Sequence, residues 1–335
     1  MLIKEVLIMY KSLLNLHDTQ VGIKLIKDGF ENKLAKKLNL TRVSAPLFVL
    51  TNSGLNDYLS GGERPVSFAA YSFDEEVEIV QSLAKWKRCV LARYDFSTGT
   101  GLYTDMNAIR PNEELDAIHS MYVDQWDWEK IIKKTERRIT YLKNTVRKIY
   151  SVILATAKEI SKKFPAITFD LPNDIFFITT KELEEMYPDL TGKERENKIT
   201  ELHRAVFLMQ IGMPLSNGKP HDGRAADYDD WRLNGDLLLW HEPLMMALEV
   251  SSMGIRVDEV SLVKQLKAKK ELYKLENDYC KALVNKELPY TIGGGIGQSR
   301  ICMYFLKKVH IGEVQASLWP EEMVKKCKDD NIFLL

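Results

Sequence analysis

The chain has 335 residues, of which 47 are Lys or Arg and 47 are Asp or Glu, so its formal net charge is zero. Hydrophobic residues make up 45% and aromatic residues 10%, which supports a substantial core and excludes an intrinsically disordered chain. The charge balance argues against a strongly basic nucleic-acid-binding protein, and the four widely spaced cysteines leave no CxxC metal or redox pair. We therefore expect a cytoplasmic protein with reduced thiols and with no nucleic-acid or membrane partner.

The N-terminal stretch, Met1 to Leu16, is apolar but interrupted by charges. Lys4, Glu5 and Lys11 divide it, so it forms neither a signal-peptide core nor a membrane span. Its apolar residues recur with helical spacing, which predicts an amphipathic helix. The same spacing predicts a second helix over 19–39.

The next part of the chain predicts strands interleaved with helices. A strand over 46–50 leads into a polar loop over 51–62 that carries Asp57. Alternating residues over 121–128 predict a strand with polar side chains on both faces, which costs free energy unless one face lines a site. We also predict a helix over 76–93, an extended segment over 101–109 and a long helix over 129–163.

The C-terminal half continues this mixture of short strands and helices. A polar, loop-like stretch lies at 216–232, and a glycine-rich turn at 293–297 leads into a helix over 298–308. We predict strands over 175–178, 205–210, 236–240 and 247–257, and helices over 181–187, 193–203 and 259–285. No Pro/Gly/Ser-rich linker divides the chain, so residues 1–335 are expected to form one α+β domain.

The glycine-rich turn is the strongest local signal of chemistry. Glycines let a backbone come close to a ligand, and the helix start that follows favours anions. Arg300 lies in the first turn of that helix, where it can meet a phosphate or an adenine ring. Without its neighbours this signal is weak, because a simple tight turn explains the glycines equally well. The chain lacks the GxxxxGK[ST] pattern, which excludes a P-loop nucleotide site.

Further charged residues gather on the predicted elements. Arg110 follows an extended run, and Ser82 and Lys87 lie five residues apart on one predicted helix. Asp236 and Glu249 fall on two neighbouring predicted strands, and paired carboxylates of this kind suit Mg²⁺. Each charge by itself is more often a solvated surface residue, but together they indicate a site.

These segments resemble the class II aminoacyl-tRNA synthetases of the aspartate and asparagine subgroup. The segment over 81–87 is similar to that subgroup's amino-acid loop, Arg110 to the arginine of motif 2, and 123–129 to its Phe-x-Gln-Leu-Asp-x-Glu strand. Its metal-binding strands and its motif 3 are matched by 234–236, 249–256 and 293–300. The resemblance implies a class II aminoacyl-tRNA-synthetase-like catalytic domain, with an antiparallel sheet flanked by helices.

The resemblance is closer still to the ammonia-dependent asparagine synthetase family, over about residues 20–320. Asn112 stands where that family has an aspartate, which weakens a carboxylate role there. The family's longer loop after Trp231 is missing, which leaves open how that loop closes the site. The most similar segments are Ser82–Arg88, Gly101–Thr104, Tyr122–Glu129, Asp227–Trp231, Leu248–Val257 and Thr291–Arg300.

This resemblance implies an ATP-dependent reaction with Mg²⁺. The β-carboxylate of aspartate attacks the α-phosphorus of ATP, β-aspartyl-adenylate and pyrophosphate form, and ammonia then gives asparagine and AMP. The implied catalytic residues are Arg110, which neutralises phosphate charge, Gln125, which orients the acyl oxygen, and Asp57, which accepts protons from ammonium. A homodimer is also implied.

The resemblance also implies the binding residues. The candidates for aspartate are Ser82, Lys87, Asp127, Arg224, Asp229 and Ser252; those for ATP or AMP are Arg110, His119, Ser120, Gly295 and Arg300; those for the metal are Asp236 and Glu249. For His119, an ordinary, partly buried histidine with no ligand is an equally good explanation.

Three rival functions remain to be weighed. A tRNA synthetase needs an anticodon-binding module, commonly an OB-fold, for which the chain has no room. A silent binding or regulatory paralogue would not need the joint presence of Arg110, Asp236, Glu249 and Arg300. A class II paralogue that adenylates an amino acid for another acceptor is not excluded. Ammonia is the expected nitrogen donor, because Leu2 stands where an N-terminal-nucleophile amidase needs cysteine.

Overall fold

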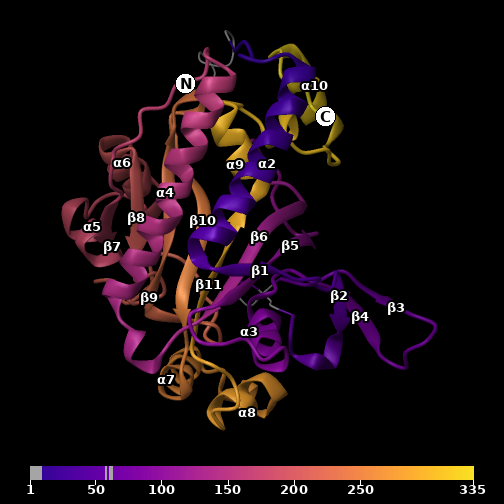
Figure 1. Ribbon diagram of the computed structural model, residues 1–335, viewed down its shortest axis with the longest axis vertical. Coiled ribbons are helices and arrows are strands. Elements are labelled where there is room, and N and C mark those ends of the chain that lie inside the picture. The colour runs from indigo at the N-terminus through magenta and orange to yellow at the C-terminus, as the bar shows by residue number, and fades with distance from the viewer. Residues whose placement is uncertain (1–9, 57–58, 60–62) are drawn as a thin grey trace.

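A mixed eight-stranded sheet forms the centre of the computed structural model, which describes residues 10–56, 59 and 63–335 (Figure 1). Its order is β1-β5-β6-β11-β10-β9-β8-β7. The inner pairings are antiparallel, whereas β1 with β5 and β7 with β8 are parallel. The strands are β1 Leu40–Arg42, β5 Gly101–Ile109, β6 Tyr122–Ile131, β7 Phe176–Thr179, β8 Ala205–Met209, β9 Asp229–His241, β10 Met246–Arg256 and β11 Thr291–Gly297.

Two long helices, α2 Leu16–Leu38 and α4 Ile139–Lys163, run along one face of this sheet together with α9 Gln298–Phe305 (Figure 1). Asn15 starts α2, because its side chain accepts a hydrogen bond from the backbone N–H of Asp18. Phe30 of α2 stacks on Trp126 of β6 with ring centroids 4.8 Å apart. Burying a side chain such as Phe30 contributes about 1.5–3 kcal/mol, so this layer carries much of the fold's stability.

Smaller elements surround the sheet. A three-stranded sheet of β2 Phe48–Leu50, β4 Glu76–Ile79 and β3 Ser67–Ala69 projects from one end of the molecule (Figure 1). The remaining helices are α3 Ala84–Arg93, α5 Thr180–Met186, α6 Gly192–His203, α7 Glu259–Lys269, α8 Asp278–Val284 and α10 Glu321–Asp329. Within the described ranges, no helix combines the length and apolar character that crossing a membrane requires.

Most predicted elements are confirmed with shifted ends, but three predictions are wrong. The predicted helix over 76–93 begins as strand β4, in which Val77 and Ile79 alternate with glutamates, and helix α3 starts only at Ala84. The predicted helix over 129–163 begins at Ile139, because β6 continues to Ile131 alongside β11. The predicted N-terminal helix lies largely outside the described residues.

The third error concerns the glycine-rich segment, which is strand β11 and not a turn. It is hydrogen-bonded between β6 and β10 in the middle of the sheet. Glycines weaken a strand, so four of them in a seven-residue central strand indicate that something lies directly on it. The cleft described below supplies the reason.

The segment after Trp231 is also strand. It belongs to β9, and the register with β10 shifts so that Gly254 faces Asn234 while Arg256 faces Asp229. A bulge of this kind bends a strand and redirects its side chains. Trp231 is buried and Arg232 is exposed, and both belong to this bulged part of β9.

Candidate active site

A cleft of about 410 Å³ lies over the central strands, and nearly all the predicted site residues line it. Its floor comes from β6, β10 and β11, and its walls come from the start of α3, the segment 110–125 and the segment 222–229. Asp57 lies outside the described residues, and Asp236 lies just behind the lining. The predicted residues that line the cleft are Ser82, Lys87, Arg110, His119, Ser120, Gln125, Asp127, Arg224, Asp229, Glu249, Ser252, Gly295 and Arg300.

The floor explains why β11 is rich in glycine. A Cβ added at Gly295 would come within 2.2 Å of Gln125 Oε1 and 2.7 Å of Asp127 Oδ1. Both side chains come from β6, which pairs with β11. Any side chain at this position would therefore displace the two polar groups that face the cleft.

Lys87 and Asp127 form a buried ion pair on this floor. Lys87 Nζ lies 3.3 Å from Asp127 Oδ2 and donates a hydrogen bond to the Gly294 carbonyl at 3.2 Å. The Lys87 side chain is only 1% exposed, and burial lowers the pKa of this lysine although Asp127 opposes the shift. Two residues predicted to bind aspartate thus bind each other. Ser82, predicted to share a helix with Lys87, precedes α3.

A second buried network is centred on Arg256 and joins the predicted residue Asp229 to Glu129; Arg256 and Glu129 were not among the predicted site residues. Arg256 Nε and Nη2 bind Glu129 at 2.7–3.1 Å, and its Nη1 binds Asp229 Oδ1 at 2.6 Å. Burial raises the pKa of Asp229 although Arg256 opposes it. Burial also disfavours ionised Glu129, but Arg256 outweighs that effect and holds the pKa of Glu129 below its usual value. Charged residues inside strands β6 and β10 were the signal that could have identified this network.

Arg224 and the two predicted metal ligands form a third charged group. Arg224 Nη2 binds Asp236 Oδ2, and its Nη1 lies 3.3 Å from Asp222 Oδ2. Burial raises the pKa of Asp236 to about 7, with Arg224 opposing and Glu249 adding to the shift. A residue predicted to bind the substrate carboxylate therefore pairs with a predicted metal ligand.

The donors at Asp236 and Glu249 fit a hard cation. Asp236 Oδ1 is buried, and no described residue hydrogen-bonds it. In the part of the chain that the structure covers, no group of three or more His, Cys, Asp or Glu side chains is arranged around a metal position. Mg²⁺ commonly uses only one or two protein carboxylates and takes further oxygens from substrate phosphates. The residues present are compatible with that mode of binding.

Cationic side chains gather at the other end of the cleft. Arg300, in the first turn of α9, donates hydrogen bonds to the Glu249 carbonyl at 3.0 Å and to the Ile118 carbonyl at 3.4 Å. Arg110 follows β5 directly, and its buried Nε has no hydrogen-bond partner among the described residues. This end can therefore receive an anion such as a phosphate.

His119 and Ser120 lie beside that end. His119 Nδ1 is 2.8 Å from Asp116 Oδ1, and Ser120 Oγ is 3.0 Å from Ser317 Oγ. The cleft thus combines a cationic end, a carboxylate pair and a floor of paired charges that suits a zwitterion.

Comparisons with known proteins identify the family of this chain. Residues 17–331 match the family model described as aspartate–ammonia ligase. The aspartate–ammonia ligase of Clostridium tetani is 59% identical over 327 residues, which cover 97% of this chain and 96% of that protein. The aspartate–ammonia ligase of Bacillus cytotoxicus is 56% identical over 326 residues, covering 97% of this chain and 100% of the other.

Solved structures with the same fold are class II synthetases. The asparaginyl-tRNA synthetase of Pyrococcus horikoshii with asparaginyl-adenylate has a TM-score of 0.65 and 16% identity, covering 90% of this chain and 70% of that one. The Entamoeba histolytica asparaginyl-tRNA synthetase with asparaginyl-adenylate has a TM-score of 0.63 and 16% identity, and the match spans 89% of this chain but 66% of the synthetase. The fold is thus that of class II synthetase catalytic domains, and the chain belongs to the aspartate–ammonia ligase family of enzymes.

Proposed function

We propose that this chain uses ATP to convert L-aspartate and ammonia into L-asparagine, through a β-aspartyl-adenylate and with release of AMP and pyrophosphate. The observation that carries the proposal is the charge layout of the cleft. Arg110 and Arg300 mark an end for phosphate and adenosine, and Lys87 with Asp127 mark a floor for an amino acid. Family membership makes aspartate and ammonia the preferred substrates.

The paired charges of the floor support a dipolar substrate. Lys87 and Arg224 are the candidates for the carboxylates of aspartate, and Asp127 and Asp229 are those for its ammonium group. In the structure Lys87 and Asp127 already form an ion pair, so a zwitterion that exchanges partners with them leaves neither buried charge alone. A substrate carboxylate that binds Arg224 would separate it from Asp236, where the proposed Mg²⁺ would take its place. Ser82 and Ser252 would add hydrogen bonds. Fixing the substrate in this way turns its β-carboxylate toward the α-phosphate.

The residues that meet the phosphates would supply electrostatic stabilisation. Arg110 and Arg300 would hold the phosphate and adenosine groups of ATP or AMP, with His119, Ser120 and the bare backbone of Gly295 as further candidates. Asp236 and Glu249 would hold Mg²⁺, whose chemistry is to neutralise phosphate charge. A preorganised donor of this kind contributes about 10²–10³-fold in rate.

The second half of the reaction needs an oriented acyl group and a proton acceptor. Gln125 faces the cleft from β6 and is the candidate to orient the acyl oxygen. Asp57 is the candidate to accept the proton that ammonium must lose before ammonia attacks, a role that we infer from the family resemblance alone.

We also propose a homodimer that works in the cytoplasm without a nucleic-acid partner. The cysteines Cys89, Cys280, Cys302 and Cys327 are free thiols, as expected in a reducing compartment. The homodimer is inferred from the family resemblance, because class II catalytic domains usually dimerise. Light scattering of the purified protein tests the dimer.

Product analysis with ATP, Mg²⁺, aspartate and either ammonium or glutamine tests the reaction. We expect asparagine, AMP and pyrophosphate with ammonium and little asparagine with glutamine. Pyrophosphate release without asparagine would instead favour adenylation for another acceptor, with tRNA the first to try. Arg110→Ala should abolish adenylate formation while the fold persists, and normal pyrophosphate release by that variant would refute the role of Arg110.

A further inference from the structure

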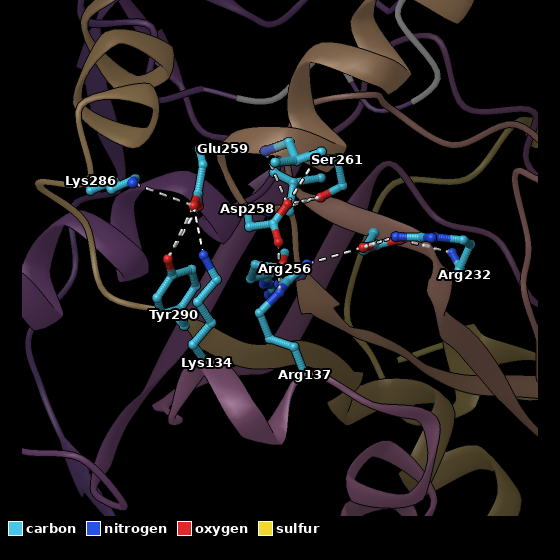
Figure 2. Close-up of polar contacts among 12 residues, drawn as sticks. Lys134, Arg137, Arg232, Arg256, Asp258, Glu259, Ser261, Lys286 and Tyr290 are labelled. Atoms are coloured by element: carbon cyan, nitrogen blue, oxygen red, sulfur yellow. Dashed lines mark hydrogen bonds and ion pairs between the residues drawn. The ribbon is translucent and has the colours of Figure 1, made fainter.

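A cluster of ion pairs adjoins the Arg256 network and is not part of the cleft lining. Figure 2 shows that it gathers around Arg137, with Arg232 on one side and the start of α7 on the other. Arg137 follows the short helical turn Lys134–Glu136, in the segment that joins β6 to α4. None of the sequence motifs or proposed ligands above includes it.

Arg137 bridges two strand ends and a helix start. Its Nη2 lies 3.1 Å from Asp230 Oδ2 of β9, and its Nε lies 3.1 Å from Asp258 Oδ2. Its Nη1 donates a hydrogen bond to the backbone carbonyl of Arg256, the last residue of β10. Asp258 is the N-cap of α7 and accepts hydrogen bonds from Val260 and Ser261.

The contacts are buried enough to fix these segments. The Arg137 side chain is 7% exposed, Asp230 is 1% exposed and Asp258 is 18% exposed. A planar guanidinium can satisfy both carboxylates and a carbonyl at once, whereas a lysine ammonium cannot match that fork geometry. Arg232 also approaches Asp230, but its side chain is 62% exposed, so solvent screens that pair.

The residues that Arg137 bridges are immediate neighbours of the Arg256 network in the sequence or belong to it. Asp230 follows Asp229, and the Arg256 whose carbonyl Arg137 holds is the residue whose side chain binds Asp229 and Glu129. Asp229 and Arg256 line the cleft, but Arg137 does not. Arg137 therefore reaches the cleft only through them, by fixing the backbone from which both side chains project.

We propose that Arg137 is a positioning residue that sets Asp229 and Arg256 at the aspartate end of the cleft, and this inference rests on the proposed function. Loss of its bridge frees the ends of β9 and β10 to shift. Displacements of about 1 Å in a binding constellation can change rates by about 100-fold. Arg110 and Arg300 form the proposed ATP end of the cleft. Within the described residues, no hydrogen bond or ion pair joins Arg137 to either of them.

The experiment compares steady-state kinetics of the full chain and its Arg137→Lys and Arg137→Gln variants. We expect the KM for aspartate to rise about 10-fold in Arg137→Lys and further in Arg137→Gln. The KM for ATP should stay within about twofold in both, a split that general destabilisation does not produce. Asp258→Asn, which keeps an N-cap side chain, should raise the KM for aspartate by a smaller factor and serves if both Arg137 variants fail to fold.

Lys134→Gln is the matched control. Lys134 lies three residues away and pairs with Glu259 at 2.8 Å, but its side chain is 58% exposed. Its variant should keep both KM values. An unchanged KM for aspartate in the folded variants, or an equal rise in both KM values, would overturn the positioning role. Wild-type protein that makes no asparagine would refute the proposed function instead.

Discussion

Gly293→Ala is the substitution that tests most directly whether the Arg256 network is packed against β11. A Cβ at this position would lie 1.9 Å from Glu129 Oε2 and 2.7 Å from Arg256 Nη2. To reach ordinary contact distance, the carboxylate oxygen must retreat by about 1.5 Å. Glu129 has little free space for that movement, because it is fully buried and bound to Arg256, whose Nη2 the same Cβ would also approach.

The expected penalty combines two effects. Inserting a methyl group into a packed interior costs about 1–3 kcal/mol. Weakening a buried ion pair adds to this, since complete removal of one partner costs about 3–5 kcal/mol. Arg256 keeps its bond to Asp229, so we expect the free energy of unfolding to fall by about 3 kcal/mol in total. Asparagine formation should fall as well, because Arg256 and Asp229 line the cleft.

Urea denaturation followed by circular dichroism measures the loss, and Gly297→Ala on the same strand is the control. The Cβ of that variant would meet only Arg300 Cβ at 3.4 Å, which is ordinary contact. Its unfolding free energy should stay within about 0.5 kcal/mol of wild type. Equal stability of the two variants would refute the close packing of Glu129 against β11.

Three further predictions concern stability. Burial lowers the pKa of His241 from 6.5 to about 4, so the unfolded chain binds a proton that the native chain does not, and stability falls as pH falls through that window. His241→Gln should flatten the pH dependence of the unfolding free energy there by up to about 1.4 kcal/mol per pH unit, and an unchanged slope would contradict the shift. Lys85 Nζ and Asp227 Oδ2 lie 2.8 Å apart with side chains at most 6% exposed, so Asp227→Asn should cost about 3–5 kcal/mol in urea unfolding. Thr191 caps α6 in a capping box with Glu194, so Thr191→Ala should lower the free energy of unfolding by about 1 kcal/mol in urea denaturation. An unchanged free energy of unfolding would contradict a stabilising role for this cap.

The sequence predicts the fold well where periodicity and burial agree. Strands β5, β8 and β10 are largely buried, and their predicted positions are confirmed to within a few residues. The predicted helix over 76–93 fails because β4 is too short for its alternation to outweigh the helical residues that follow it. Local periodicity cannot show which short segment finds a pairing partner.

The glycine-rich segment fails as a turn for a different reason. Glycine is common in turns, so composition favours a turn whenever glycines are close together. Here the glycines leave room for side chains that pack against β11: Gln125 and Asp127 lie over Gly295, and Glu129 and Arg256 lie over Gly293. That requirement comes from strands far away in the sequence, and only the assembled sheet reveals it.

Most candidate site residues could be named from the sequence because they fall inside long motifs, but their pairing could not. The sequence suggested that Lys87 binds a carboxylate and that Asp127 binds an ammonium group, and the structure joins these two to each other. The same holds for Arg224 with Asp236. Pairing depends on side-chain direction across neighbouring elements, which a linear pattern does not contain.

This self-pairing bears on how the cleft would distinguish aspartate from asparagine under the proposed function. A buried charge without a partner costs several kcal/mol, so the floor tolerates only a ligand that returns a charge to each residue it separates. Aspartate carries one ammonium and two carboxylate groups, so it can satisfy Asp127, Lys87 and Arg224 together, while the Mg²⁺ proposed at Asp236 replaces Arg224 there. Asparagine carries one carboxylate fewer, so one of these cations returns to its protein partner, Asp127 or Asp236, and the product is held by fewer ion pairs. The pairs that hold the empty cleft together thus also favour release of the product.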